Sequence, residues 1–172
     1  MLLNAAVEVD YAEIMDLVNL ALQGSEASAS WNIEVGILEG QRLHEALLRE
    51  DLAANAGLPI HRDEANGTLL GTVWPDPEKG DVWNPGLLTV RPGPQNKQLG
   101  RTLFTAAEDF VKERGAHRIC MTVVNVRMTL IAWCERRGYA LTGETRPFPY
   151  GDERFNRPLR DDLHFVVLSK DL

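Results

Sequence analysis

Four stretches of the chain place apolar residues three or four positions apart, a spacing that predicts amphipathic helices. The expected helices cover residues 11 to about 24, 39–55, 99–114 and 127–137. Asp10 is expected to cap the first of them. Gly115 and Gly138 follow the last two, as is typical of helix ends. The pattern therefore predicts four helices with long segments between them.

The remaining apolar runs are short and rich in β-branched or aromatic residues, which favours strands. The expected strands cover residues 2–9, 81–90, 117–124, 139–145 and 162–169, with two more inside 58–75. Asn66-Gly67 divides the pair in 58–75 and is a strong hairpin signal. Pro85 indicates a bulge or an irregular start in the strand that contains it. The final segment, 160–172, is expected to be an edge strand with charged ends.

The order of these elements is β-α-α-β-β-β-α-β-α-β-β. It predicts an α/β (α+β) fold with a mixed, mostly antiparallel twisted sheet, one β-α-β crossover and helices on both faces. The crossover should be right-handed and should make its two strands parallel neighbours. Ligands commonly bind beyond the carboxyl ends of such strands. Any site is therefore expected at Val90, at the loop 91–98 and near Val124.

Composition narrows the class of protein. The 172 residues fit one domain, 1–172. A net charge of −7 and a pI near 5.1 argue against a protein that binds nucleic acid through its overall electrostatic field. The start lacks the basic region of a signal peptide, and no apolar run approaches the ~18 residues of a membrane span. The two cysteines follow no metal-ligand spacing. A cytoplasmic protein without a bound metal is expected.

The loop before the helix 99–114 has an unusual charge distribution. It carries Arg91, Lys97 and Arg101, and no acidic residue occurs from Val82 to Ala107. Cations at a helix N-terminus cost about 0.3–1 kcal/mol each unless an anion lies between them, whereas a phosphate there would meet backbone N–H groups as well. The loop is thus a candidate anion site; the alternative is that these are solvated loop residues.

Two runs, "LLTVRPGPQNKQLGRTLFTAAEDFVKERGAHRICMTV" (87–123) and "LIAWCERRGYALTGETRPF" (130–148), resemble the GNAT superfamily of acyl-CoA-dependent N-acetyltransferases. The family's signature, Gln/Arg-x-x-Gly-x-Gly/Ala, falls on residues 95–100, and a second pattern falls on "CERRGY", 134–139. The element order also matches that fold. The resemblance covers about residues 86–148.

The resemblance implies acetyl-CoA as co-substrate and a coenzyme A site on the loop, where backbone amides bind the pyrophosphate. Leu88, Thr89 and Val90 would offer main-chain groups to the acetyl and pantetheine parts. The implied cofactor-binding residues are Leu88, Thr89, Val90, Gln95, Asn96, Lys97, Gln98, Leu99, Gly100, Arg101, Thr102, Asn125 and Arg127.

Three positions depart from the family's pattern. Gln98 stands where the first signature glycine is expected, which costs about 1–2 kcal/mol only if the backbone there is left-handed. Cys134 replaces a tyrosine that often protonates the leaving thiolate; a thiol could do this, or simply pack in the core. Arg127 replaces an asparagine, with Asn125 two residues earlier, and an arginine could reach a phosphate or a pantetheine carbonyl.

Aminolysis of a thioester also needs a group that takes a proton from the amine. Glu34 is the first candidate, since related proteins often place acceptor-facing residues in this loop; the alternative is that it is an exposed loop acid. Asp81 and Glu144 are further candidates. Trp31 is expected to wall the acceptor pocket or to cover the core.

The sequence thus predicts a cytoplasmic N-acetyltransferase that transfers acetyl from acetyl-CoA directly to a primary amine of a small molecule. Glu34 and Cys134 are its candidate catalytic residues, and Trp31 and Glu34 its candidate acceptor-binding residues. Two alternatives stay open: a catalytically degenerate acyl-CoA-binding or sensing domain, and a protein or peptide N-acetyltransferase. No nucleic-acid or membrane partner is expected, and the protein is expected to be a monomer or a homodimer.

Overall fold

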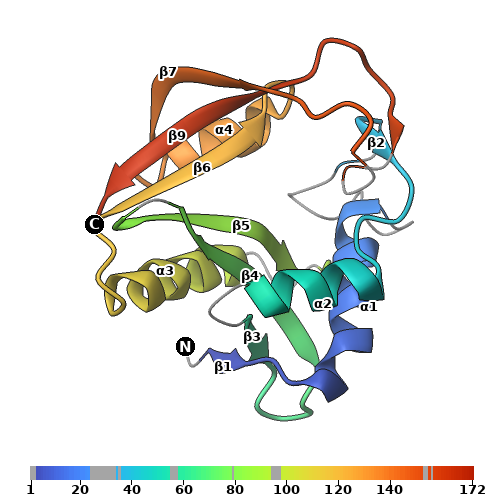
Figure 1. Ribbon diagram of the computed structural model, residues 1–172. Helices are drawn as coiled ribbons and strands as arrows, with labels where there is room; N and C mark the ends of the chain where they lie inside the picture. The colour runs from blue at the N-terminus through green and yellow to red at the C-terminus, as the bar shows by residue number, and fades with distance from the viewer. Residues whose placement is uncertain are drawn as a thin grey trace.

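The computed structural model describes residues 3–23, 34, 36–54, 58–78, 80–93, 98–152, 155 and 157–172. Its main sheet has the strand order β1-β3-β4-β5-β6-β9-β7, and β2 pairs with β8 in a separate ribbon (Figure 1). The strands are β1 Asn4–Ala5, β2 Leu38–Glu39, β3 Pro59–Arg62, β4 Leu69–Pro77, β5 Val82–Val90, β6 Arg118–Val124, β7 Ala140–Pro147, β8 Arg157–Pro158 and β9 His164–Asp171. The helices are α1 Tyr11–Gln23, α2 Glu45–Ala54, α3 Leu99–Lys112 and α4 Met128–Glu135, with a short 3₁₀ helix at Glu8–Asp10.

Helices cover both faces of the sheet, as the element order predicts. On one face, α1 and α2 bury Leu17, Leu48 and their neighbours against β3 and β4. On the other, α3 and α4 bury Leu103, Ile131 and others against β5, β6 and β9. All strand pairs of the main sheet are antiparallel except β5–β6. The mixed, mostly antiparallel α/β fold is confirmed.

The parallel pair β5–β6 separates along its length. Its pairing, all within the described residues, covers Val82 with Arg118 and Trp83 with Ile119. Beyond this point the two strands diverge in Figure 1, with α3 beneath β5 and α4 beside β6. The carboxyl ends of the strands therefore border an opening in the middle of the sheet.

The bulge expected near Pro85 lies two residues later. Pro85 pairs in register with Pro75, whereas Trp74 faces Gly86 and Thr72 faces Thr89, so β5 holds one extra residue there. Leu87 lies at this point with φ of 45°. Leu87 packs toward the α1–α2 core and Leu88 into the α3–α4 core, so burial on both faces keeps the bulge at this position.

Two further expectations about the bounds of elements were wrong, one because of a local turn and one because of long-range pairing. The strand expected over 2–9 is only Asn4–Ala5, because the chain turns into the 3₁₀ helix and Asp10 accepts a hydrogen bond from the Val7 N–H at 2.8 Å. The second helix begins at Glu45 rather than at residue 39, because Leu38–Glu39 pairs with β8.

The last strand is not at an edge. β9 lies between β6 and β7 and pairs with both, so β7 is the edge strand on this side of the sheet. Most residues of β7 are exposed, whereas Val167 and Leu168 of β9 are buried. The charged ends of the segment 160–172 therefore flank an interior strand.

No helix in the described part of the chain combines the length and the apolar character that crossing a bilayer requires.

Candidate functional site

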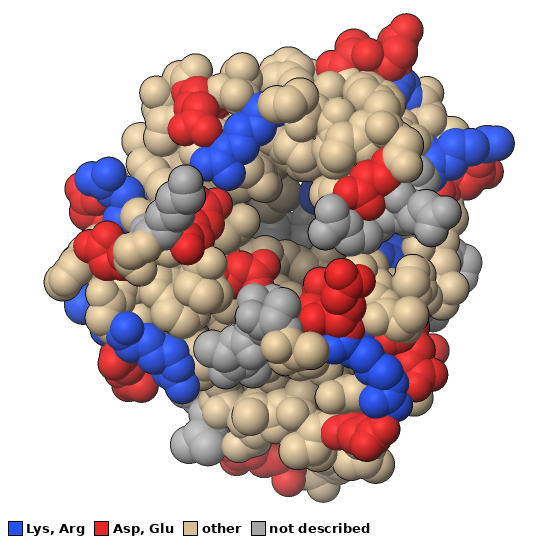
Figure 2. All heavy atoms as spheres, in the orientation of Figure 1, with Lys and Arg blue, Asp and Glu red and all other residues tan. Residues whose placement is uncertain are grey.

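A cavity of about 550 Å³ continues the opening between β5 and β6. Its walls come from the helices α1, α2, α3 and α4 and the strands β4, β5, β6, β7 and β9, together with Glu34, Leu38, Arg42 and Leu43. Figure 2 shows the molecule hollowed near the centre of the face in view, where β5 and β6 separate in Figure 1, with acidic and basic side chains at the margin. A cavity thus lies at the carboxyl ends of the crossover strands, where the sequence predicts a site.

The bulged strand β5 forms one wall. Leu87 and Leu88 line the cavity, and Leu88, Thr89 and Val90 are all buried. The Thr89 hydroxyl donates to the Leu87 carbonyl at 3.2 Å, which bridges the bulge. The three residues expected to align a thioester therefore lie on a rigid strand, and Leu88 faces the cavity.

The N-terminus of α3 is compatible with an anion. Its first turn contains no acid, and the Gln98 side chain caps no backbone group. Gln98 has φ of −108° and ψ of −13°, a right-handed conformation, so the missing glycine costs no left-handed strain. The Thr102 hydroxyl bonds the Gln98 carbonyl at 3.1 Å. The predicted loop residues Gln95, Asn96 and Lys97 lie outside the described residues, as does Trp31.

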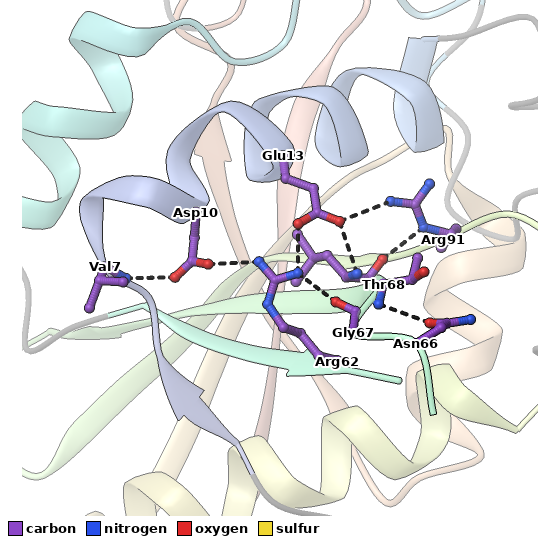
Figure 3. A network of polar contacts seen from close by, with 9 residues as sticks. Val7, Asp10, Glu13, Arg62, Asn66, Gly67, Thr68 and Arg91 are labelled. Atoms are coloured by element: carbon purple, nitrogen blue, oxygen red, sulfur yellow. Dashed lines mark hydrogen bonds and ion pairs between the residues drawn. The ribbon is translucent and has the colours of Figure 1, made fainter. Parts of the chain in front are cut away.

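The sequence placed Arg91 in the candidate anion loop, but in the structure its side chain binds groups of the protein itself. Its Nε donates to the Leu69 carbonyl at 2.7 Å, and its Nη2 lies 3.9 Å from Glu13 (Figure 3). Glu13 also accepts from the Leu69 N–H and from Arg62, which in turn binds Asp10 at 2.7 Å. Burial acts to raise the pKa of Glu13, but these donors outweigh it and lower the pKa. This network fixes the strand end from which the loop departs.

A second recess, of about 490 Å³, lies beside α3. Arg101 of the first helical turn lines it together with Arg136, Arg137 and Lys170. Glu108, at its wall, accepts hydrogen bonds from Lys170 at 2.9 Å and from the Tyr139 hydroxyl at 2.8 Å. Burial lowers the pKa of Arg137, and the charges of Arg136 and Arg101 lower it further, which indicates that positive charge is concentrated here. An otherwise acidic protein thus gathers cations beside the first half of α3.

Glu34 and Arg127 form one buried group in the wall of the main cavity. Arg127 Nη1 lies 3.5 Å from Glu34 Oε1, and Arg42 Nε lies 3.3 Å from Glu34 Oε2. All three side chains are at most 16% exposed. Burial lowers the pKa of Arg127 while Glu34 raises it, and a guanidinium remains charged in either case. Glu34 is therefore neither an exposed loop acid nor an isolated carboxylate.

Asn125 uses both ends of its amide inside the protein. Its Nδ2 donates to the Asp162 carbonyl at 3.2 Å, and its Oδ1 accepts from the His164 N–H at 3.1 Å. It joins the end of β6 to the start of β9, outside the lining of either cavity.

Cys134 lies on α4 and lines the cavity from within the α3–α4 core, with 2% of its surface exposed. Burial raises the pKa of its thiol to about 11. The thiol is therefore protonated at neutral pH, and a protonated thiol is a poor nucleophile. Both of the expected roles, a packed apolar side chain and a weak acid, are compatible with this position.

The cavity also contains a carboxylate that the sequence did not single out. Asp76, on β4, lies in its wall, while the candidates Asp81 and Glu144 are exposed and outside the lining. Glu144 binds Arg146 at 2.8 Å. The signal available for Asp76 was a single acid inside the apolar strand run "GTVWPDP", 71–77. Only the position of β4 beside the cavity shows that this acid lies in the cavity wall.

Comparisons with known proteins agree with this geometry. The model of the acetyltransferase (GNAT) family matches residues 24–139. Streptothricin acetyltransferase of Streptomyces lavendulae is 38% identical over 66 residues, 36% of this chain and 35% of that protein. Mycothiol acetyltransferase of Beutenbergia cavernae is 30% identical over 105 residues, 55% of this chain and 34% of that protein. The chain thus spans about a third of the length of these curated relatives.

The fold itself has solved counterparts. A GNAT family acetyltransferase from Elizabethkingia anophelis, determined with acetyl-CoA bound, superposes with a TM-score of 0.62 at 14% identity, over 75% of this chain and 84% of that one. At this identity the likeness concerns the fold.

Proposed function

Because this chain belongs to the acetyltransferase (GNAT) family, we propose that it is an acetyl-CoA-dependent N-acetyltransferase acting on a primary amine of a small molecule. The observation that carries the proposal is the cavity between the separated strands β5 and β6. Phe104 of α3 lines both this cavity and the recess that contains Arg101, and the first turn of the same helix contains no acid.

The residues present fit acetyl-CoA. The start of α3 offers backbone N–H groups and Arg101, and the recess beside it adds Arg136, Arg137 and Lys170 for phosphate groups. The opening along β5 is lined by Leu88, as the apolar part of a pantetheine arm requires. Bound acetyl-CoA would supply the acetyl group as a thioester.

The size of the cavity favours a small acceptor. Ligand pockets for small molecules typically measure about 300–1,000 Å³, and this one measures about 550 Å³. The two curated relatives are named for small molecules, streptothricin and mycothiol. Both observations support a small-molecule amine over a folded protein as the acceptor.

Direct transfer is the mechanism that the residues support. Cys134, with a protonated buried thiol, is a poor candidate for an acyl-enzyme nucleophile. We assign it a packing role behind the thioester. Glu34, Arg42 and Arg127 form a charged wall whose net charge is positive, so they orient the acceptor or the pantetheine carbonyls.

The proposal is tested in two steps. Calorimetry with acetyl-CoA, with dephospho-CoA as the comparison ligand, measures donor binding; absence of heat would contradict the assignment. Release of free thiol is then followed over a panel of amines: a streptothricin antibiotic, amino acids, diamines and a short peptide with a free N-terminus. Turnover of a small amine is expected. Turnover of the peptide alone would favour a protein substrate, and binding without any turnover would favour a sensing domain.

A further inference from the structure

Four buried polar atoms in the wall of the cavity make no hydrogen bond among the described residues, and two of them, Glu34 Oε2 and Arg42 Nε, form an ion pair with each other. The other two have no such partner. One is the indole Nε1 of Trp74, whose side chain is 4% exposed, and the other is Oδ1 of Asp76. Both residues line the cavity. Buried donors and acceptors are nearly always paired, so an unpaired donor and an unpaired acceptor in one cavity indicate a polar ligand.

Their placement on β4 brings the two groups together. Residues two apart on a strand point to the same face, with their Cα atoms about 6–7 Å apart. Trp74 lies opposite Gly86 and Asp76 opposite Asn84 on β5. A Cβ on Gly86 would lie 3.7 Å from Asp76 Oδ2, so the carboxylate is next to the residue that precedes the bulge. The donor and the acceptor thus lie opposite residues 84–86 of β5, just before the segment that is expected to align the thioester.

The surroundings keep Asp76 basic enough to take a proton. Burial, and then the charge of Asp51 on α2, raise the pKa of Asp76 from 3.8 to about 6. At neutral pH it is ionised, and its basicity is closer to the working pH than that of an ordinary carboxylate. The other charged side chains that line the cavity are Glu34, Arg42, Asp51, Arg127 and Arg146.

We propose that Asp76 is the residue that takes the proton from the acceptor amine, and that the Trp74 indole N–H binds an oxygen atom of the same acceptor. This inference rests on the proposed acetyltransferase function and deepens it. It also specifies a class of acceptor: a primary amine with a hydroxyl or carbonyl oxygen a few bonds away.

The chemical step balances with these groups. The acceptor ammonium gives one proton to the Asp76 carboxylate, directly or through a water. The freed nitrogen lone pair forms the new C–N bond to the acetyl carbonyl carbon, and the C–S bond breaks. The sulfur leaves with the electron pair of that bond and takes up the second proton lost by nitrogen. Asp76 then releases its proton to solvent.

Glu34 is less suited to this step. Each of its carboxylate oxygens lies within 3.5 Å of a guanidinium nitrogen, from Arg127 or from Arg42. Taking up a proton would remove the countercharge of two buried cations, which is costly. Among the described residues no cation forms an ion pair with Asp76, and protonation removes both the cost of burying its charge and its repulsion by Asp51.

The test is the pH profile of kcat/KM for three aspartate variants on the best amine of the panel. In the wild type we expect an acidic limb with a midpoint near 6. Asp76→Asn should lower kcat/KM by about 10²–10⁴-fold and abolish the limb. Asp51→Asn should move the limb to lower pH, because it removes a repelling charge. The exposed Asp109→Asn, on α3 and outside the cavity lining, is the matched control and should leave the profile unchanged.

Trp74→Phe tests the second contact. It removes the N–H and should raise KM by about 2–12-fold with a smaller change in kcat, because one hydrogen bond is worth ~0.5–1.5 kcal/mol. Acetyl-CoA affinity, measured by calorimetry, should be the same in all four variants. An unchanged KM would overturn the assignment of Trp74.

The outcomes separate this inference from the proposed function. A wild type that turns over none of the amines contradicts both. Turnover by the wild type together with an intact profile in Asp76→Asn overturns the inference and leaves the acetyltransferase assignment standing. Loss of the limb in Glu34→Gln instead would assign the proton to Glu34.

Discussion

Asp76 is a side chain whose ionised form is disfavoured by folding. Its pKa in the folded protein is about 6, against 3.8 without the fold. The folded state therefore holds the proton more tightly, and stability falls as pH rises from about 4 to 6 and stays lower above that range. If Asp76 serves the reaction, this loss is tolerated for the sake of catalysis.

Asp76→Asn should therefore be more stable than the wild type at about pH 8 and equally stable at about pH 4. After allowance for solvent screening of a partly exposed group we expect a gain of about 1 kcal/mol, or about 2–4 °C in Tm. Thermal unfolding at both pH values measures it. A lower Tm at pH 8 would show that the carboxylate has a stabilising partner.

Cys134 provides a contrasting prediction. Because its side chain is buried in the α3–α4 core, Cys134→Ala should lower stability by about 1 kcal/mol while kcat changes less than about threefold. Chemical denaturation and steady-state kinetics measure the two effects. Cys134→Ser keeps a hydrogen-bond donor, so activity kept by serine but lost by alanine would instead indicate that the thiol donates a proton.

At the scale of elements, Gly71 determines how closely α3 approaches the sheet. A Cβ at this position on β4 would lie 2.7 Å from Leu103 Cδ2 and 3.0 Å from the Thr89 carbonyl oxygen. Leu103 is a side chain of α3 and can shift, but Thr89 belongs to the backbone of β5. The absence of a side chain at Gly71 thus holds the start of α3 and the bulged strand together.

Gly71→Ala should destabilise the protein by about 1–3 kcal/mol, as overpacking typically does, and should weaken acetyl-CoA binding because α3 is displaced. Denaturation and calorimetry on the same variant measure both. Gly86→Ala is the control for stability, since its Cβ would meet only contacts of 3.6 Å or longer. Equal destabilisation of the two variants would show that close approach at Gly71 is unimportant.

Elements with a strong local signal were predictable, and those defined by distant partners were not. The periodicity of α1 and α3 and the Asn66-Gly67 turn are short-range features, and each element lies where it was expected. The β2–β8 pairing joins segments more than a hundred residues apart, and the insertion of β9 between β6 and β7 depends on the whole sheet. The local pattern of apolar and polar residues does not identify these distant strand partners.

The same distinction holds for the candidate site at the scale of the whole molecule. The proposed anion loop occupies one continuous segment, so spacing and charge in the sequence suffice to propose it, and it stays a prediction. The acceptor cavity combines residues from α2, β4, β5, β6 and α4, which meet only in the folded protein. Asp76 and Trp74 become notable only when burial leaves them without partners, and that property is absent from the sequence.

The net charge of −7 of the whole molecule disfavours the binding of an anionic donor. A field that repels anions must be overcome locally, and the cations Arg101, Arg136 and Arg137 line one recess beside α3. We therefore predict that Arg101→Ala weakens acetyl-CoA binding by about five- to tenfold, from the loss of ~1 kcal/mol of charge-assisted contact. Calorimetry at low and high salt measures it.

The salt dependence makes this prediction specific. Added salt screens charges, so it should weaken binding to the wild type more than binding to Arg101→Ala, and the two affinities should converge. Arg114→Ala is the matched control, because Arg114 follows the opposite end of α3 and stacks on Phe110. An equal loss in both variants would mean that overall charge, rather than the recess, governs binding. With acetyl-CoA in hundredfold excess over its Kd the wild type should gain about 2.7 kcal/mol of stability, and Arg101→Ala should gain less at the same concentration.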